Sequence, residues 1–194
     1  MRRFYRVGDD VVDERPRTFE TVDPATGELV EAWAVPHPDE FMDSDFLEDE
    51  RLDELLEEVI AAFPEFEFLE RWRVRILWKS AIGGKHPLGT CQLASGLIAH
   101  FGKADFIILL SAEDVRIRVF RPKQVEALIY HELLHCTEKV GRMETKPAIR
   151  PHDLEVFAGE LKHYGAWRSA IEGMRRPFRE LEAMLAIPDS EVSG

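Results

Sequence analysis

The sequence predicts an α+β domain in which a small mixed or antiparallel β-sheet packs on two helices, with further helices at the C-terminal end. Three observations support this fold class. Apolar residues recur at helical spacing between residues 45 and 63 and again between 122 and 140. Between these segments, residues 72–79 alternate between apolar and basic side chains, as in a half-buried strand. Residues 105–111 are almost continuously apolar, as in a strand buried on both faces.

Composition and charge exclude several classes of protein. The chain has 194 residues, of which 45% are hydrophobic and 32% are charged, which is ordinary for a globular protein. Two cysteines are too few for a disulfide framework, and no segment has the length or pattern of a membrane span or a secretory signal. We therefore expect an intracellular, cytoplasmic protein without a membrane partner. The net charge of −12 argues against nucleic-acid binding through the whole surface.

The pattern suggests three parts along the chain, namely an N-terminal extension over 1–44, a main domain over 45–187 and a tail over 188–194. The first 17 residues show no clear period and are expected to attach loosely. A turn-rich insert, Asp23-Pro24-Ala25-Thr26-Gly27, separates two runs that favour a β-hairpin, 18–22 and 28–35.

The remaining elements follow from period and from turn residues. A helix over 45–63 should stop at Pro64. Further strands are expected at 72–79, 90–99 and 105–111, and the last of these could form a cleft edge that pairs with an extended peptide. A helix should begin at Pro122 and end at Gly141, and a basic loop should lead to a helix over 151–164 closed by Gly165. Helical material is expected at 167–174 and 178–185.

The helix predicted after Pro122 carries the motif HELLH, residues 131–135. Residues four apart project from one face of a helix, so His131 and His135 can place two imidazole nitrogens on one zinc ion. Glu132 stands beside the first of them and can take a proton from a zinc-bound water as general base. Each fixed position of HExxH therefore has a chemical task, and the motif predicts a zinc-dependent peptidase that acts on a protein or peptide substrate.

A catalytic zinc needs a third protein ligand and one open position. His152 and Glu155 are the candidates, three residues apart on the predicted second helix. Glu155 follows His135 by twenty residues, a spacing that resembles thermolysin-type enzymes. His152 would lie in the first helical turn, where the helix dipole favours the neutral imidazole that binds metal. From the residues alone both assignments stay open.

HELLH followed by the run HDLEVF, residues 152–157, resembles the putative phage metallopeptidase family and, more distantly, SprT-like zinc proteases. The similarity covers roughly residues 52–165. It implies a zincin-like fold, a Zn²⁺ cofactor, proteolysis and a phage or prophage origin, and it implies His152 as the third ligand. Glu155 would then orient an imidazole. Asp153 stands where SprT-like proteins have glycine, and the sequence has no obvious zinc ribbon, so the resemblance does not extend to their DNA-linked role.

Three hypotheses follow. The first is a zinc peptidase with His131, His135 and His152 as ligands and Glu132 as general base. The second is a catalytically silent, zinc-stabilised binding protein. The third is a nucleic-acid-associated protease that uses the basic residues of the strand at 71–79. We rank them in that order.

Overall fold

The structure, a computed structural model, describes residues 5–7, 10–12, 15–83, 88–141, 144–152, 158–165 and 167. The chain divides into two compact units, residues 1–152 and 153–194. Among the described residues, no helix is long and apolar enough to cross a membrane. The three parts predicted from the sequence (1–44, 45–187 and 188–194) stay a prediction.

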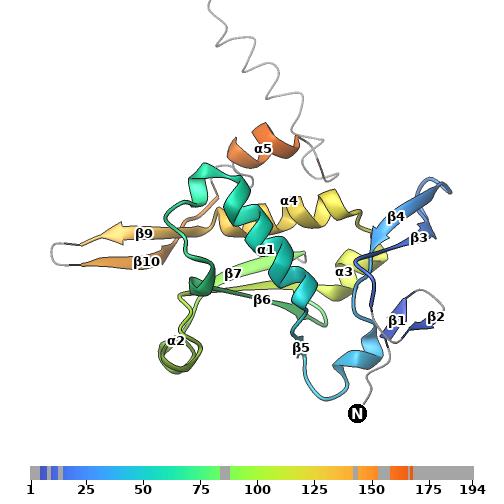
Figure 1. Ribbon diagram of the computed structural model, residues 1–194, viewed down its shortest axis with the longest axis horizontal. Coiled ribbons are helices and arrows are strands. Elements are labelled where there is room, and N and C mark those ends of the chain that lie inside the picture. The colour runs from blue at the N-terminus through green and yellow to red at the C-terminus, as the bar shows by residue number, and fades with distance from the viewer. Residues whose placement is uncertain are drawn as a thin grey trace, which may run out of the picture. The chain divides into compact units, whose positions relative to one another are not determined.

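A four-stranded mixed sheet lies at the centre of the first unit (Figure 1). Its strands are β5 (Phe46–Leu47), β6 (Val74–Lys79), β7 (Gly89–Leu93) and β8 (Phe106–Ser111), in the order β5-β6-β8-β7. β6 and β8 are parallel, whereas β5 and β7 are antiparallel to their neighbours. Every residue of β8 is buried, as its apolar run predicts. The predicted α+β class with a small mixed sheet therefore agrees with the structure.

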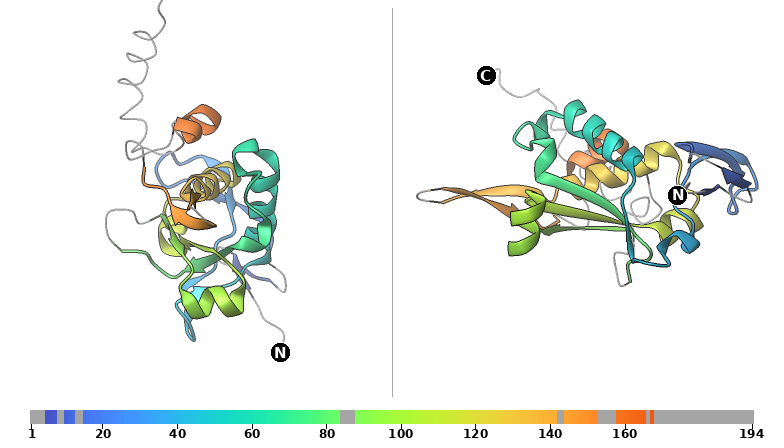
Figure 2. Two further views of the ribbon diagram at one scale, coloured as in Figure 1. Left: turned by 90° about the vertical axis from the view of Figure 1, so that its left-hand side faces the viewer. Right: turned by 60° about the horizontal axis from the view of Figure 1, so that its bottom comes forward.

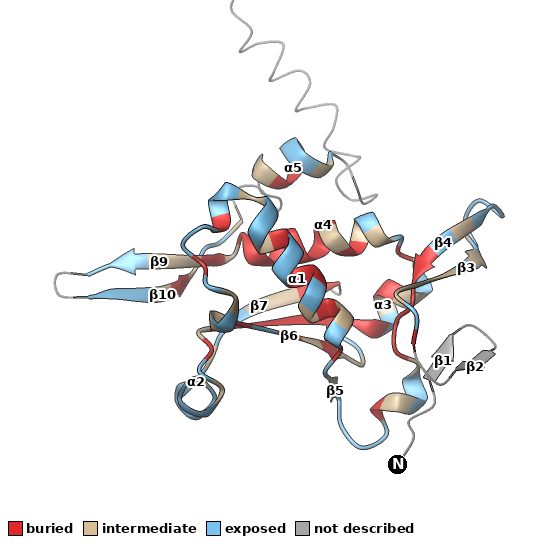
Figure 3. Cartoon of the chain, in the orientation of Figure 1, coloured by how far each residue is buried: buried red, intermediate tan, exposed pale blue. Residues whose placement is uncertain are grey.

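Two helices, α1 (Glu50–Ala62) and α4 (Pro122–Leu133), pack against each other and against this sheet (Figures 1 and 2). α1 contacts β6, and α4 contacts β7. The buried side chains of α1 recur at helical spacing, so α1 is amphipathic. Most residues of α4 are buried, as the burial colours in Figure 3 show. In addition to α1 and β7, α4 contacts β4 (Leu29–Trp33).

The N-terminal region is more ordered than the sequence suggests. The first 17 residues show no pattern of regular structure, but β1 (Tyr5–Val7) and β2 (Asp10–Val12) pair antiparallel. The predicted hairpin at 18–35 is confirmed as β3 (Thr18–Val22) paired with β4. It is anchored at its end, because Trp33 is buried and its backbone N–H donates to the Phe120 carbonyl at 2.8 Å.

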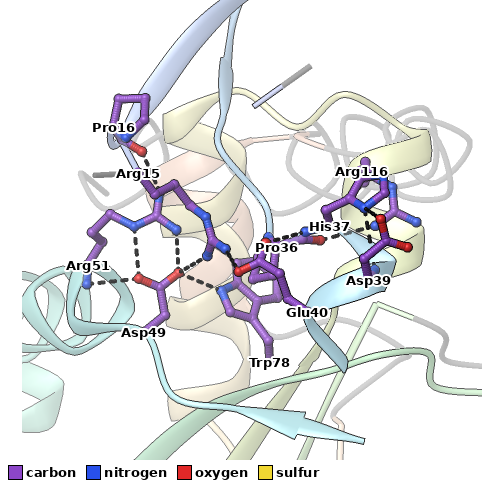
Figure 4. A network of polar contacts seen from close by, with 10 residues as sticks. All are labelled: Arg15, Pro16, Pro36, His37, Asp39, Glu40, Asp49, Arg51, Trp78 and Arg116. Atoms are coloured by element: carbon purple, nitrogen blue, oxygen red, sulfur yellow. Dashed lines mark hydrogen bonds and ion pairs between the residues drawn. The ribbon is translucent and has the colours of Figure 1, made fainter. Parts of the chain in front are cut away.

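A buried polar network joins this region to the start of α1 (Figure 4). Asp49 accepts hydrogen bonds from the Arg51 Nε at 2.8 Å and from the Trp78 Nε1 at 2.9 Å. Arg15, predicted to lie in a loosely attached segment, is buried and pairs with Asp49 and Glu40. Burial, opposed by these carboxylates, lowers the pKa of Arg15.

Asp49 also explains why α1 starts later than predicted. The helix is expected from residue 45, but Asp49 caps its first turn by accepting from the backbone N–H of Arg51. The preceding residues pair with β6 as the short strand β5. The hydrophobic period thus identifies the helix, and tertiary strand pairing sets where it begins.

Two further strands are predicted too long. Trp72 is expected to share the buried face of the strand at 72–79, but it lies in η3 (Arg71–Arg73) and is exposed. The strand predicted at 90–99 ends at Leu93, and α2 (Gly96–Gly102) follows it. α2 is short and ends at Lys103 in the left-handed conformation, with φ of 51°. The short helix α3 (Ala112–Ile117), which follows β8, is not predicted from the sequence.

The largest correction concerns the segment after HELLH. The helix predicted to run to residue 140 ends at Leu133, and a hairpin of β9 (Cys136–Val140) and β10 (Thr145–Ile149) replaces its last turns and the predicted basic loop. Cys136 and Val140 fit a helical period after Leu133, but residues 136–140 form a complete antiparallel ladder with 145–149. Pairing with the next strand of the hairpin overrides the apolar period of the preceding helix.

The helix predicted over 151–164 is found only in part. Pro151 and His152 lie outside any helix, and α5 (Ala158–Tyr164) belongs to the second unit. Gly165, with φ of 61°, follows α5 as the predicted C-terminal stop. Residues 153–157, and the helices and tail predicted beyond Trp167, lie outside the described residues.

Candidate metal centre

Three histidines converge at the C-terminal end of α4. His131 lies in the last turn of the helix and is 4% exposed, and His135 follows in the turn after it. His152 comes from a different segment, three residues after the end of β10. One ring nitrogen of each lies within 4.8 Å of the others, and the Nε2 atoms of His131 and His152 are 3.0 Å apart. The structure thus brings together the three residues predicted as metal ligands.

This spacing fits a tetrahedral zinc site. Two nitrogens that each lie about 2.05 Å from zinc at a tetrahedral angle are roughly 3.3 Å apart. The 3.0 Å between His131 and His152 is close to that value, and one ring nitrogen from each of the three histidines lies within 4.8 Å of the others. Imidazole nitrogen is a preferred zinc ligand, and three protein ligands leave one position open, as a catalytic zinc requires.

The backbone orients one of these rings. The Nδ1 of His135 lies 2.7 Å from the carbonyl oxygen of Arg150. A carbonyl can only accept a hydrogen bond, so Nδ1 carries the hydrogen and Nε2 is the nitrogen with the lone pair. A hydrogen bond of this kind to the second nitrogen commonly fixes the tautomer and direction of a metal-binding histidine. It favours Nε2 of His135 as the ligand atom.

The β9–β10 hairpin sets the distance between the second and third histidines. Cys136 pairs with Ile149 at the base of the hairpin, and the Arg150 N–H donates to the His135 carbonyl at 2.8 Å just beyond that pair. His152 follows two residues after Arg150. The intervening hairpin extends away from the central sheet, so the two histidines are close in space although they are far apart in sequence (Figure 1).

Glu132 lies in α4 beside His131 and is 3% exposed. Its side chain packs against the backbone of β7 at Gly89, so closely that a Cβ atom added to this glycine would lie 2.6 Å from Oε1. α4 and β7 are in contact along this part of the unit. The first strand residue of β7 therefore forms a wall beside the carboxylate predicted to be the general base.

Several residues considered with the site are placed elsewhere or lie outside the described residues. Glu155, the alternative third ligand, and the neighbouring Asp153 are outside them. His152 itself does not lie in a helical turn, so the predicted dipole effect on that residue does not apply. Tyr130, which precedes His131 in α4, is buried against Phe63 and Phe66, and its hydroxyl donates a hydrogen bond to Glu65.

The predicted cleft edge also needs correction. β8 is expected from the sequence to pair with an extended peptide, but it lies between β6 and β7 inside the sheet. β5 and β7 are the edge strands, and β7 is the one that contacts Glu132. The order of strands depends on contacts between segments far apart in sequence, and the apolar run of residues 106–111 indicates only burial.

Two of the basic residues near the start of β6, Arg71 and Arg73, are engaged with carboxylates, whereas Arg75 is exposed and donates to the Gly102 carbonyl. Arg73 bonds through Nε to Asp105 at 2.5 Å and through Nη1 to Glu138 of β9 at 2.6 Å. Burial alone would lower the pKa of Arg73, but its hydrogen bonds to Asp105 and Glu138 outweigh burial and raise it. Arg71 pairs with Asp53 of α1. These ion pairs hold the helix and the hairpin to the sheet.

Two features near the site are not predicted from the sequence. Gly89 suggests only the end of a loop, and no local pattern indicates its contact with Glu132. Nothing in the sequence places the two cysteines together, but Cys136 is buried and its sulfur lies 3.6 Å from that of Cys91. The Cys91 hydrogen bond, together with burial, raises the pKa of Cys136 well above its usual value.

Comparison with protein-family models identifies a family to which most of the chain is similar. The profile of the family described as "Putative phage metallopeptidase" matches residues 44–179, which is more than half of the chain and includes α1, the central sheet and all three histidines. Searches of curated proteins and of solved structures gave no significant match. The more distant resemblance to SprT-like proteases stays a prediction. On this match, the chain belongs to the phage metallopeptidase family.

Proposed function

We propose that this protein is a zinc-dependent metallopeptidase in which His131, His135 and His152 hold the metal and Glu132 is the general base. The observation that carries the proposal is the convergence of three imidazoles at the end of α4, where the buried Glu132 is next to His131 in the helix. Membership of the family supports metal-dependent proteolysis and a phage or prophage origin. An α1–sheet–α4 arrangement with HELLH at the end of α4 is consistent with a zincin-like fold.

Each residue has a defined part in peptide hydrolysis. Zinc held by the three histidines would supply a Lewis acid that lowers the pKa of a coordinated water toward 7. Glu132 accepts the proton of the attacking water and then delivers it to the nitrogen of the leaving amine. The Arg150 carbonyl keeps the His135 ring in the tautomer that presents Nε2.

The substrate strand is proposed to lie along β7. An extended peptide can add to the exposed edge of a sheet through backbone hydrogen bonds, and β7 is the edge strand nearest to Glu132. A peptide in this position would bring one of its carbonyl groups to the end of α4.

The test compares two Glu→Gln substitutions on the same helix. Glu132→Gln should keep zinc, measured by elemental analysis of the purified protein, and should lower the rate of casein cleavage by roughly 10²–10⁴-fold. Glu126→Gln is the matched control, because Glu126 lies on α4 and pairs with Lys123 at the surface. It should leave both zinc content and cleavage unchanged.

The outcomes separate the first two hypotheses. Full cleavage by the Glu132→Gln variant would contradict the role of Glu132. A wild-type protein that holds one zinc but cleaves no protein substrate would instead match a zinc-stabilised binding protein. If the protein is such a binding protein, the Glu132→Gln variant should keep the biological effect of the wild type.

A further inference from the structure

Gly89, the first residue of β7, is in unusually close contact with the Glu132 side chain. A Cβ atom built on Gly89 would lie 2.6 Å from Oε1, 3.1 Å from Cδ and 3.2 Å from Cγ of Glu132. Contacts below 3.0 Å are essentially never seen for real Cβ atoms. Any other residue at this position would therefore collide with the outer half of the Glu132 side chain.

The backbone of Gly89 does not itself require glycine. Among the described glycines only Gly27 and Gly165 have a positive φ, the region in which other residues are strained. Gly89 pairs with Leu110 in an ordinary antiparallel ladder. Glycine in a strand weakens it, because it has no side chain to pack and loses more conformational entropy on folding. The space it leaves for Glu132 is therefore the property that distinguishes glycine here.

We propose that Gly89 is a positioning residue for the general base. This inference rests on the proposed peptidase function and adds that β7, at Gly89, sets the position of the Glu132 carboxylate. Because Gly89 has no side chain, the backbone of β7 can approach the Glu132 carboxylate directly and serve as its back wall. The same strand is the proposed edge for the substrate, so one piece of backbone aligns both the base and the peptide.

A methyl group at position 89 is accommodated at the lowest energetic cost if the Glu132 carboxylate moves. Its oxygen would have to retreat by about 0.8 Å to reach the 3.4 Å at which ordinary van der Waals contact begins. The far end of a side chain moves more easily than the backbone of two packed elements. A misplacement of about 1 Å in a catalytic group can lower the rate by roughly 10²-fold. The substitution should therefore affect catalysis more than folding.

The first test measures zinc content and casein cleavage for Gly89→Ala. We expect one zinc per chain, an unchanged KM and a kcat lowered roughly ten- to a hundredfold. Gly96→Ala is the matched control, because a Cβ there meets no atom within 4 Å. It should match the wild type in all three measurements. A Gly89→Ala protein with wild-type kcat, in a protein that Glu132→Gln inactivates, would overturn the positioning role and leave the peptidase function intact.

The second test does not depend on any substrate. Glu132→Ala removes all three atoms that a Cβ at position 89 would approach. The shift in urea midpoint caused by Gly89→Ala should therefore be clearly smaller in the Glu132→Ala background than in the wild type. Equal shifts in the two backgrounds would show that the methyl group does not press on Glu132 and would overturn the inference. If the shifts are unequal but the wild-type protein has no peptidase activity, the contact between Gly89 and Glu132 is supported and the proposed function is refuted.

Discussion

Insertion of one alanine between Ile149 and Arg150 would displace the third histidine relative to the other two. Cys136 and Ile149 are paired at the base of the β9–β10 hairpin, and His152 follows directly from that pair. Each strand residue advances the chain by about 3.3 Å. This step exceeds the whole 3.0 Å separation between the Nε2 atoms of His131 and His152.

The expected loss of zinc affinity follows from that displacement. Zinc sites tolerate ligand distances that differ by only about 0.2 Å from their usual values. Loss of a partner that merely orients a ligand commonly lowers metal affinity by roughly 10–100-fold. Displacement of a ligand itself should therefore lower zinc affinity by at least about 100-fold. The insertion would also move Arg150 away from its two contacts with His135, the Nδ1 contact at 2.7 Å and the backbone hydrogen bond at 2.8 Å.

The assay is competition for zinc with a colorimetric chelator, with circular dichroism to verify folding. The control inserts one alanine after Gly141, at the tip of the same hairpin, where the strand pairs at its base stay in register. The control should bind zinc within a factor of about three of wild type, since it moves no ligand. If the Ile149 insertion also kept wild-type affinity, the hairpin register could not be what places His152.

Three further predictions concern stability and reactivity. Leu128→Ala should lower the free energy of unfolding by about 2–5 kcal/mol in urea denaturation, because Leu128 of α4 is 1% exposed and lies in the hydrophobic core. The hydrogen bond from Arg17 lowers the pKa of Glu58 in the folded protein. This pair therefore stabilises the fold fully above the unfolded carboxyl pKa of about 4.3, and the stabilisation is lost as the pH falls through the lower pKa of Glu58 in the folded state. Arg17→Met should remove this pH dependence and lower the free energy of unfolding at pH 7 by less than about 1 kcal/mol, because both side chains are exposed and screened by solvent. A larger decrease in urea denaturation curves recorded in parallel would contradict this prediction. The Cys91 hydrogen bond and burial raise the pKa of Cys136, so iodoacetamide at pH 8 should alkylate Cys136 only after unfolding in urea, as mass spectrometry can test.

The part of the metal centre that lies within one turn of helix could be predicted from the sequence. His131 and His135 are four residues apart, and this spacing brings them together even though α4 ends at Leu133 and His135 occupies the following turn. The backbone N–H of His135 still donates to the Glu132 carbonyl at 3.2 Å. Local geometry thus preserves the pair of histidines despite an error of several residues in the predicted end of the helix.

The third histidine could not be placed by the same reasoning. His152 reaches the site through the pairing of β9 with β10, which depends on residues up to thirteen positions apart. The sequence suggests a helix and a loop there, because Cys136 and Val140 continue the apolar period of α4. With that interpretation, His152 and Glu155 are both accessible candidates, and resemblance to a family is what favours His152. The strand order and the contact between Gly89 and Glu132 are non-local in the same way.

Metal analysis of the wild type and two single variants tests the three-histidine centre most directly. We predict one zinc per chain in the wild type and in Glu155→Ala, and a loss of zinc in His152→Ala after dialysis against a weak chelator. Retention of zinc by His152→Ala, together with its loss from Glu155→Ala, would contradict the assignment of His152 as the third ligand.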